Sequence, residues 1–143
     1  MRGAICQVLA VGFIIACAGD APTAGTPPIK GQWTLSTLGG RALPITCVPT
    51  NCPAHSQTQG LGLRVDVLSS SLSVAAGGSW SETLNLSIVT STGTYNQPKT
   101  IHGTYARTGT FVHFAATGDP EYMDCEITLE ALTCGDGKAR YTR

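Results

Sequence analysis

The chain has 143 residues, of which 42% are hydrophobic and 13% are charged, with nine basic and nine acidic side chains. This balance gives no basic surface for nucleic acid and argues against that class of partner. Because Glu and Lys are scarce, the composition favours short strands and Ser-, Thr- and Gly-rich turns over surface helices.

Residues 1–16 have the composition of a signal peptide. Met1 and Arg2 give a positively charged start, and residues 8–16 form an uncharged apolar run. Such a run is too short to remain as a membrane-spanning helix, so we predict that it directs export and is then removed. The mature part keeps eight basic residues against nine acidic ones because Arg2 is lost.

The apolar run ends in the sequence Ile-Ile-Ala-Cys, with the cysteine at Cys17. This ending resembles the lipobox of bacterial lipoproteins. The resemblance implies that Cys17 is acylated and anchors the protein to a membrane of the cell envelope, on its periplasmic face or at the cell surface. An ordinary signal peptide, cleaved near Ala18 or Ala21, is the alternative. Residues 17–30 contain three prolines and no apolar periodicity, and are predicted to be a flexible linker.

Residues 31–143 are predicted to form one all-β domain, since no stretch carries a helical pattern or helix caps. Apolar and polar residues alternate in short runs bounded by Gly, Pro, Asp or Ser. We predict eight or nine strands, near residues 31–38, 61–68, 72–76, 80–89, 101–107, 111–114, 122–129, 132–134 and 139–143, with residues 69–71 as a turn. An up-and-down antiparallel barrel would bury the apolar faces and leave few exposed edges, and a two-sheet sandwich is the alternative.

Four cysteines remain in this domain, and an even number in an exported protein favours disulfides over a metal site. A hairpin turning at residues 129–130 would place Cys125 opposite Cys134, at a position where facing side chains approach closely. Cys47 and Cys52 are close enough in sequence to bridge a local loop. We therefore predict the pairs Cys47–Cys52 and Cys125–Cys134.

Three short motifs resemble the small lipocalin-like domains of bacterial lipoproteins. They are Gly31-Gln32-Trp33-Thr34-Leu35, Gly78-Ser79-Trp80 and Gly103-Thr104-Tyr105. The resemblance implies a barrel whose floor is closed by Trp33, with an arginine near the last strand packed across its ring. Arg140 is the expected arginine, ahead of Arg143, and a cation over an indole would stabilise this closure.

Residues that could carry chemistry are few. His102 and His113 are expected on neighbouring strands that turn near residues 107–108, where a facing pair could bind a metal, but we interpret both as pointing outward. Asp119, Glu121, Asp124 and Glu126 lack the spacing of a calcium loop and are interpreted as a solvated rim. No nucleophile elbow, zinc-protease motif or phosphate loop is found. We therefore predict no enzyme activity, catalytic residues, metal or cofactor.

The predicted protein is a monomeric, membrane-tethered barrel that binds a small apolar ligand or an envelope partner. The alternative is an inhibitor of an envelope or secreted hydrolase that acts through the Cys47–Cys52 loop. An eight-stranded barrel can be filled by its own side chains or can hold one small ligand, so no ligand-binding residues are assigned from the sequence.

Overall fold

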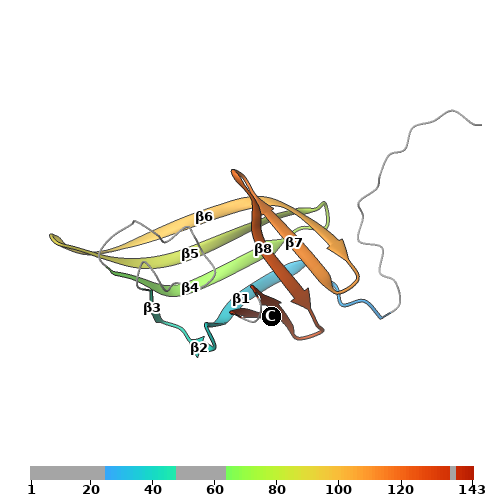
Figure 1. Ribbon diagram of the computed structural model, residues 1–143, viewed down its shortest axis with the longest axis horizontal. Helices are drawn as coiled ribbons and strands as arrows, with labels where there is room; N and C mark the ends of the chain where they lie inside the picture. The colour runs from blue at the N-terminus through green and yellow to red at the C-terminus, as the bar shows by residue number, and fades with distance from the viewer. Residues whose placement is uncertain (1–24, 48–63, 136–137) are drawn as a thin grey trace, which may run out of the picture.

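The computed structural model of the chain describes residues 25–47, 64–135 and 138–143. The predicted signal peptide, the acylation of Cys17 and the Cys47–Cys52 bridge depend on residues outside these ranges. Within them the chain forms only strands and turns (Figure 1). The strands are β1 (Gly31–Leu38), β2 (Arg41–Ala42), β3 (Ile45–Cys47), β4 (Arg64–Val74), β5 (Ser79–Thr90), β6 (Gly93–Thr108), β7 (Phe111–Ala116), β8 (Asp119–Ile127), β9 (Ala131–Cys134) and β10 (Ala139–Thr142).

Eight of these strands close into an antiparallel barrel, which confirms the predicted fold class. From β4 to β10 each strand pairs with the next one along the chain. The ring is closed by β1, which pairs with β4 through residues 31–34 and with β10 through residues 34–38. The short strands β2 and β3 lie outside the ring, paired with β1 and β4 respectively.

Two strands are longer than their sequences indicate. The turn predicted at residues 69–71 is wrong, because β4 runs through these serines and shifts register between Val67 and Ser69. This shift changes which alternate residues face inward, so that both Val67 and Ser70 are buried. The strand β6 begins at Gly93, not near residue 101, and its first half extends with β5 beyond the rest of the barrel (Figure 1).

Different segments of the chain lie at the two ends of the barrel. At one end lie residues 25–30, together with the β4–β5, β6–β7 and β8–β9 turns (Figure 1), and Arg143 contacts this segment through the carbonyl of Pro28. We call residues 25–30 the strap and this end the strap end. The long β5–β6 hairpin turns at the opposite end, which we call the hairpin end.

Trp33 is fully buried near the strap end and is held by the strap. Its indole Nε1 donates a hydrogen bond to the carbonyl oxygen of Ile29 over 2.8 Å. The guanidinium carbon of Arg143 lies 4.2 Å from the centre of the Trp33 ring, and its Nη2 donates to the carbonyl of Pro28. The predicted partner Arg140 is wrong: it is exposed on β10, because its neighbours on both sides point inward.

The strap belongs to the packed domain, although residues 17–30 were all expected to be a flexible linker. Pro27 and Ile29 are both buried, and Ile29 has no exposed surface. The packed domain therefore begins before the predicted boundary at Gly31.

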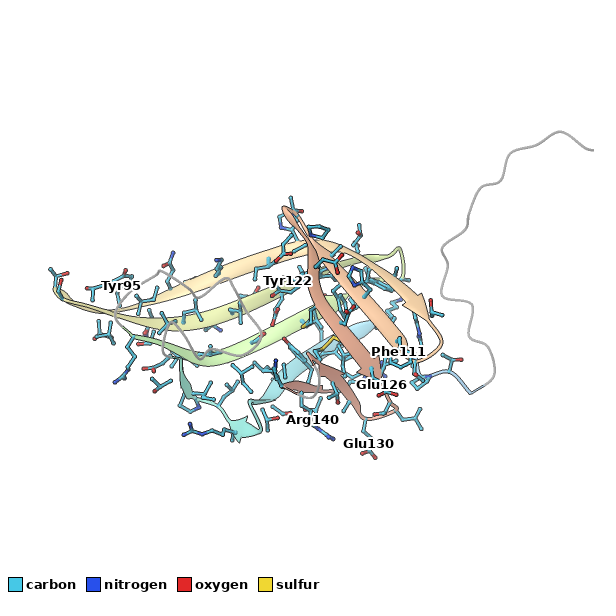
Figure 2. All side chains as sticks on the ribbon, viewed as in Figure 1. Tyr95, Phe111, Tyr122, Glu126, Glu130 and Arg140 are labelled. Carbon is cyan, nitrogen blue, oxygen red and sulfur yellow. A yellow bond between two sulfur atoms is a disulfide. The ribbon has the colours of Figure 1, made fainter. Side chains whose placement is uncertain are left out.

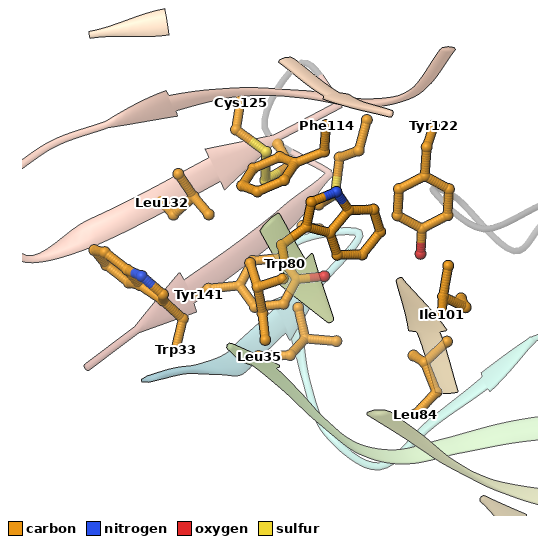
Figure 3. Packing of buried hydrophobic residues seen from close by; sticks show 14 of the residues in the cluster. Trp33, Leu35, Trp80, Leu84, Ile101, Phe114, Tyr122, Cys125, Leu132 and Tyr141 are labelled. Carbon is orange, nitrogen blue, oxygen red and sulfur yellow. A yellow bond between two sulfur atoms is a disulfide. The ribbon is translucent and has the colours of Figure 1, made fainter. Parts of the chain in front are cut away.

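Aromatic side chains fill much of the barrel interior (Figure 3). Trp80 packs against Phe114, with ring centres 5.4 Å apart and nearly perpendicular, and stacks on Tyr122 at 5.1 Å. Beside Trp80, Gly103 lets β6 and β7 approach closely: a Cβ added there would lie 1.8 Å from the carbonyl oxygen of Ala115.

The hairpin formed by β8 and β9 carries the disulfide between Cys125 and Cys134, as the sequence predicted. The two residues pair directly across the strands, with their Cα atoms 4.0 Å apart. Ile127 pairs with Leu132, which centres the turn on residues 129–130 and confirms the predicted register.

Candidate functional site

A buried carboxylate lies inside the barrel. Glu82, on β5, has no exposed surface and accepts hydrogen bonds from three hydroxyl groups on three other strands. Its Oε1 accepts from Ser70 on β4 over 2.5 Å and from Tyr141 on β10 over 2.7 Å. Its Oε2 accepts from Tyr122 on β8 over 2.9 Å. We call these four residues the interior network.

The interior network is best explained as part of the core. A buried carboxylate is costly unless it is hydrogen-bonded, and three hydroxyl donors meet that requirement here. Burial raises the pKa values of Tyr122 and Tyr141, and the negative charge of Glu82 raises them further. Both phenols therefore stay protonated at physiological pH and keep donating. The hydrogen bonds of the interior network join β4, β5, β8 and β10. Because Glu82, Ser70 and Tyr141 are closed to solvent, the network does not present a binding surface.

A hollow on the outer wall of the barrel is more accessible. It has a volume of about 370 Å³ and lies over β6, β7 and β8. We call it the outer hollow, and it is lined by Ala106, Thr108, Phe111, Val112, His113, Asp124 and Cys125. Most of this lining is apolar, which suits contact with an apolar group.

The polar part of the outer hollow is an ion pair between neighbouring strands. Nδ1 of His113 lies 2.6 Å from Oδ1 of Asp124, and Nε2 lies 2.9 Å from the carbonyl oxygen of Pro120. Since both ring nitrogens face acceptors, the doubly protonated imidazolium fits this position best. The hydrogen bond to Asp124 is the main cause that raises the pKa of His113. With both nitrogens engaged, His113 is suited to hold a positive charge and unsuited to accept a proton from a substrate.

Phe111 stands at the edge of the outer hollow. It is the first residue of β7, it pairs with Glu126 on β8, and 66% of its surface is exposed (Figure 2). An aromatic side chain this exposed contributes little to the core, and aromatic residues of this kind are frequent anchors in binding interfaces.

The structure separates the two histidines that were expected to face each other. The β6–β7 turn lies at residues 109–110, so His113 pairs with Ala106. The carbonyl of His102 accepts instead from the backbone N–H of Thr117, over 3.0 Å. Both side chains point outward, as we interpreted them. Among the described residues, no three His, Cys, Asp or Glu side chains are grouped so that they could hold a metal ion.

Sequence reasoning assigned no role to Glu82, and it interpreted Phe111, like the other aromatic residues, as part of the core or of a barrel end, whereas its side chain is strongly exposed. The pattern did contain a signal for Glu82, because it shares the inward alternation of Trp80, Leu84 and Leu86. A carboxylate at such a position requires donors from other strands. The sequence does not show which donors these are, since Tyr122 and Tyr141 are 40 and 59 residues away.

Comparison of the chain with protein-family models, curated proteins and solved structures finds no match. In the described part of the chain there is no helix with the length and apolar character needed to cross a membrane.

Proposed function

We propose that this protein is a membrane-tethered binding module of the cell envelope, which engages an envelope partner through the outer hollow and Phe111. The observation that carries the proposal is a strongly exposed aromatic side chain beside a largely apolar hollow, on the outside of a barrel. The tether in this proposal is an acyl chain on Cys17, which follows from the lipobox resemblance.

The disulfide between Cys125 and Cys134 supports an exported location. Disulfides persist in the periplasm and at cell surfaces, and are rare where thiols are kept reduced. The outward position of Phe111 favours a partner on the barrel wall over a small ligand inside it, because Trp33, Phe114 and Tyr141 occupy interior positions with no exposed surface.

Photo-crosslinking tests this proposal in cells that produce the protein. A photoreactive phenylalanine analogue is placed at Phe111, and at Tyr95 as a control that is half exposed near the hairpin end. We expect a specific adduct, to an envelope protein or lipid, from position 111 and not from position 95. Equal adducts at both positions, or none at position 111, would refute the proposed surface. Mass measurement of the purified mature protein tests acylation of Cys17 separately.

A further inference from the structure

The two most exposed large hydrophobic side chains of the described residues both lie at the strap end. Leu129, in the β8–β9 turn, is 74% exposed, and Phe111, directly after the β6–β7 turn, is 66% exposed. The backbone N–H of Ile127 donates to the carbonyl of Thr110 over 2.8 Å, so the two turns are adjacent. Two exposed apolar side chains on adjacent turns offer an apolar contact to a partner at this end of the barrel.

The chain also enters the barrel at this end. The buried Pro27 and Ile29 fix the strap against the barrel, so the described part of the chain begins at the strap end (Figure 1). Eight residue steps separate Gly25 from Cys17. A chain of that length reaches about 29 Å at most. An acyl chain on Cys17 would therefore keep the strap end near the bilayer surface.

Charges at the strap end are mixed in sign. Lys30 in the strap and Arg143 beside it are exposed, and Arg107 donates from its Nε to the carbonyl of Gly109 in the β6–β7 turn. Glu126, across from Phe111, and Glu130, next to Leu129, offset two of these three positive charges (Figure 2). The single remaining positive charge gives only a weak attraction to anionic lipid, so the contact would depend on apolar insertion.

We propose that the strap end docks on the lipid bilayer, with Leu129 and Phe111 inserted at the membrane interface. This inference rests on the proposed function, because it names the bilayer as the partner of the Phe111 surface. Two adjacent side chains are too small for a stable protein interface, which usually buries about 800 Å² on each partner. They suffice for a bilayer when a tether supplies a high local concentration.

The acylated mature protein, reconstituted on phosphatidylcholine vesicles, tests this inference. Three variants each carry a reporter tryptophan, Leu129→Trp, Phe111→Trp and the control Tyr95→Trp. The vesicles are prepared with and without bromine atoms on the acyl chains, which quench nearby tryptophan. Because interfacial side chains lie about 5–10 Å into the boundary of headgroups and acyl chains, we expect brominated lipid to lower the added emission about twofold for Leu129→Trp and Phe111→Trp. The Tyr95→Trp signal should not change.

Equal quenching of Leu129→Trp and Tyr95→Trp, or no quenching of Leu129→Trp, would overturn the docking. Replacing part of the phosphatidylcholine with phosphatidylglycerol should leave the quenching unchanged, and a strong increase would overturn the apolar mechanism. A crosslink from position 111 to a protein, without quenching on vesicles, would reject the bilayer as partner while leaving the proposed binding function in place.

Discussion

The hydroxyl of Tyr141 makes one of the three hydrogen bonds that stabilise the buried carboxylate of Glu82, and its removal gives a sharp test of the interior network. The Tyr141→Phe variant keeps the ring and loses a bond of 2.7 Å to Oε1. Oε1 still accepts from Ser70, whereas Oε2 accepts only from Tyr122 among the described residues. The Tyr122→Phe variant should therefore be the more damaging of the two.

Hydrogen bonds to charged groups contribute about 1.5–3 kcal/mol to stability. We expect Tyr141→Phe to lower the free energy of unfolding by about 1.5–2 kcal/mol, and Tyr122→Phe by about 3 kcal/mol. For a domain of this size, about 4 °C of melting temperature corresponds to 1 kcal/mol, so the expected shifts are about 6–8 °C and about 12 °C. Urea denaturation followed by tryptophan fluorescence measures the free energy of unfolding of both variants, because Trp80 stacks on Tyr122 and reports on this part of the core.

A double-mutant cycle decides whether the hydroxyl acts through the carboxylate. In a Glu82→Gln background the cost of Tyr141→Phe should fall, since the acceptor is no longer charged. The Tyr95→Phe variant is the control, and a change at this half-exposed position should stay within about 0.5 kcal/mol. An equal cost of Tyr141→Phe in both backgrounds, or a cost below that of the control, would refute the argument.

Three further predictions concern other parts of the barrel. Replacing Cys125 and Cys134 by Ala removes a cross-link between residues nine apart. Loop entropy predicts that the free energy of unfolding, measured by denaturant, falls by about 2.5 kcal/mol. NMR titration should give a pKa of His113 above 6.5 that falls toward 6.5 in Asp124→Asn. Because that pKa is raised, the contact with Asp124 stabilises the folded protein fully below pH 6.5, and this stabilisation is lost as the pH rises through the folded-state pKa. The melting temperature should therefore decline slightly over this pH range in the wild type and not in Asp124→Asn. Gly103→Ala would place a Cβ 1.8 Å from a β7 carbonyl oxygen, and should cost about 3 kcal/mol in denaturant unfolding.

Local signals in the sequence predicted part of the fold well. The strand Gly31–Leu38 has the predicted bounds because Trp33 and Leu35 alternate with polar residues and Gly39 follows at once. The hairpin joining Cys125 and Cys134 was also predictable from local sequence, because a two-residue turn fixes the pairing of the residues on both sides of it.

Longer-range features were hidden from sequence reasoning. The first half of β6 contains Pro98 and is mostly exposed, so it lacks the alternation that indicates a strand. The register shift in β4 placed Ser70 inside the barrel, where a serine was interpreted as part of a turn. Arg143 was passed over for Arg140 because the contact with Trp33 depends on where β10 ends and on the carbonyl of Pro28. In the outer hollow, sequence reasoning singled out His113 and Asp124 but not the ion pair between them.

The strap also determines how mechanical load would enter the barrel. A pull on the chain before Gly25 first meets the bonds from Trp33 to Ile29 and from Arg143 to Pro28. Beyond them the force runs along β1, which is paired with β4 over its first half and with β10 over its second. Pulled along its axis, β1 must break these backbone bonds together, in shear, and cannot peel away one pair at a time. Forced unfolding is governed by the unfolding rate, so the strand that closes the ring would also set the barrel's resistance to tension.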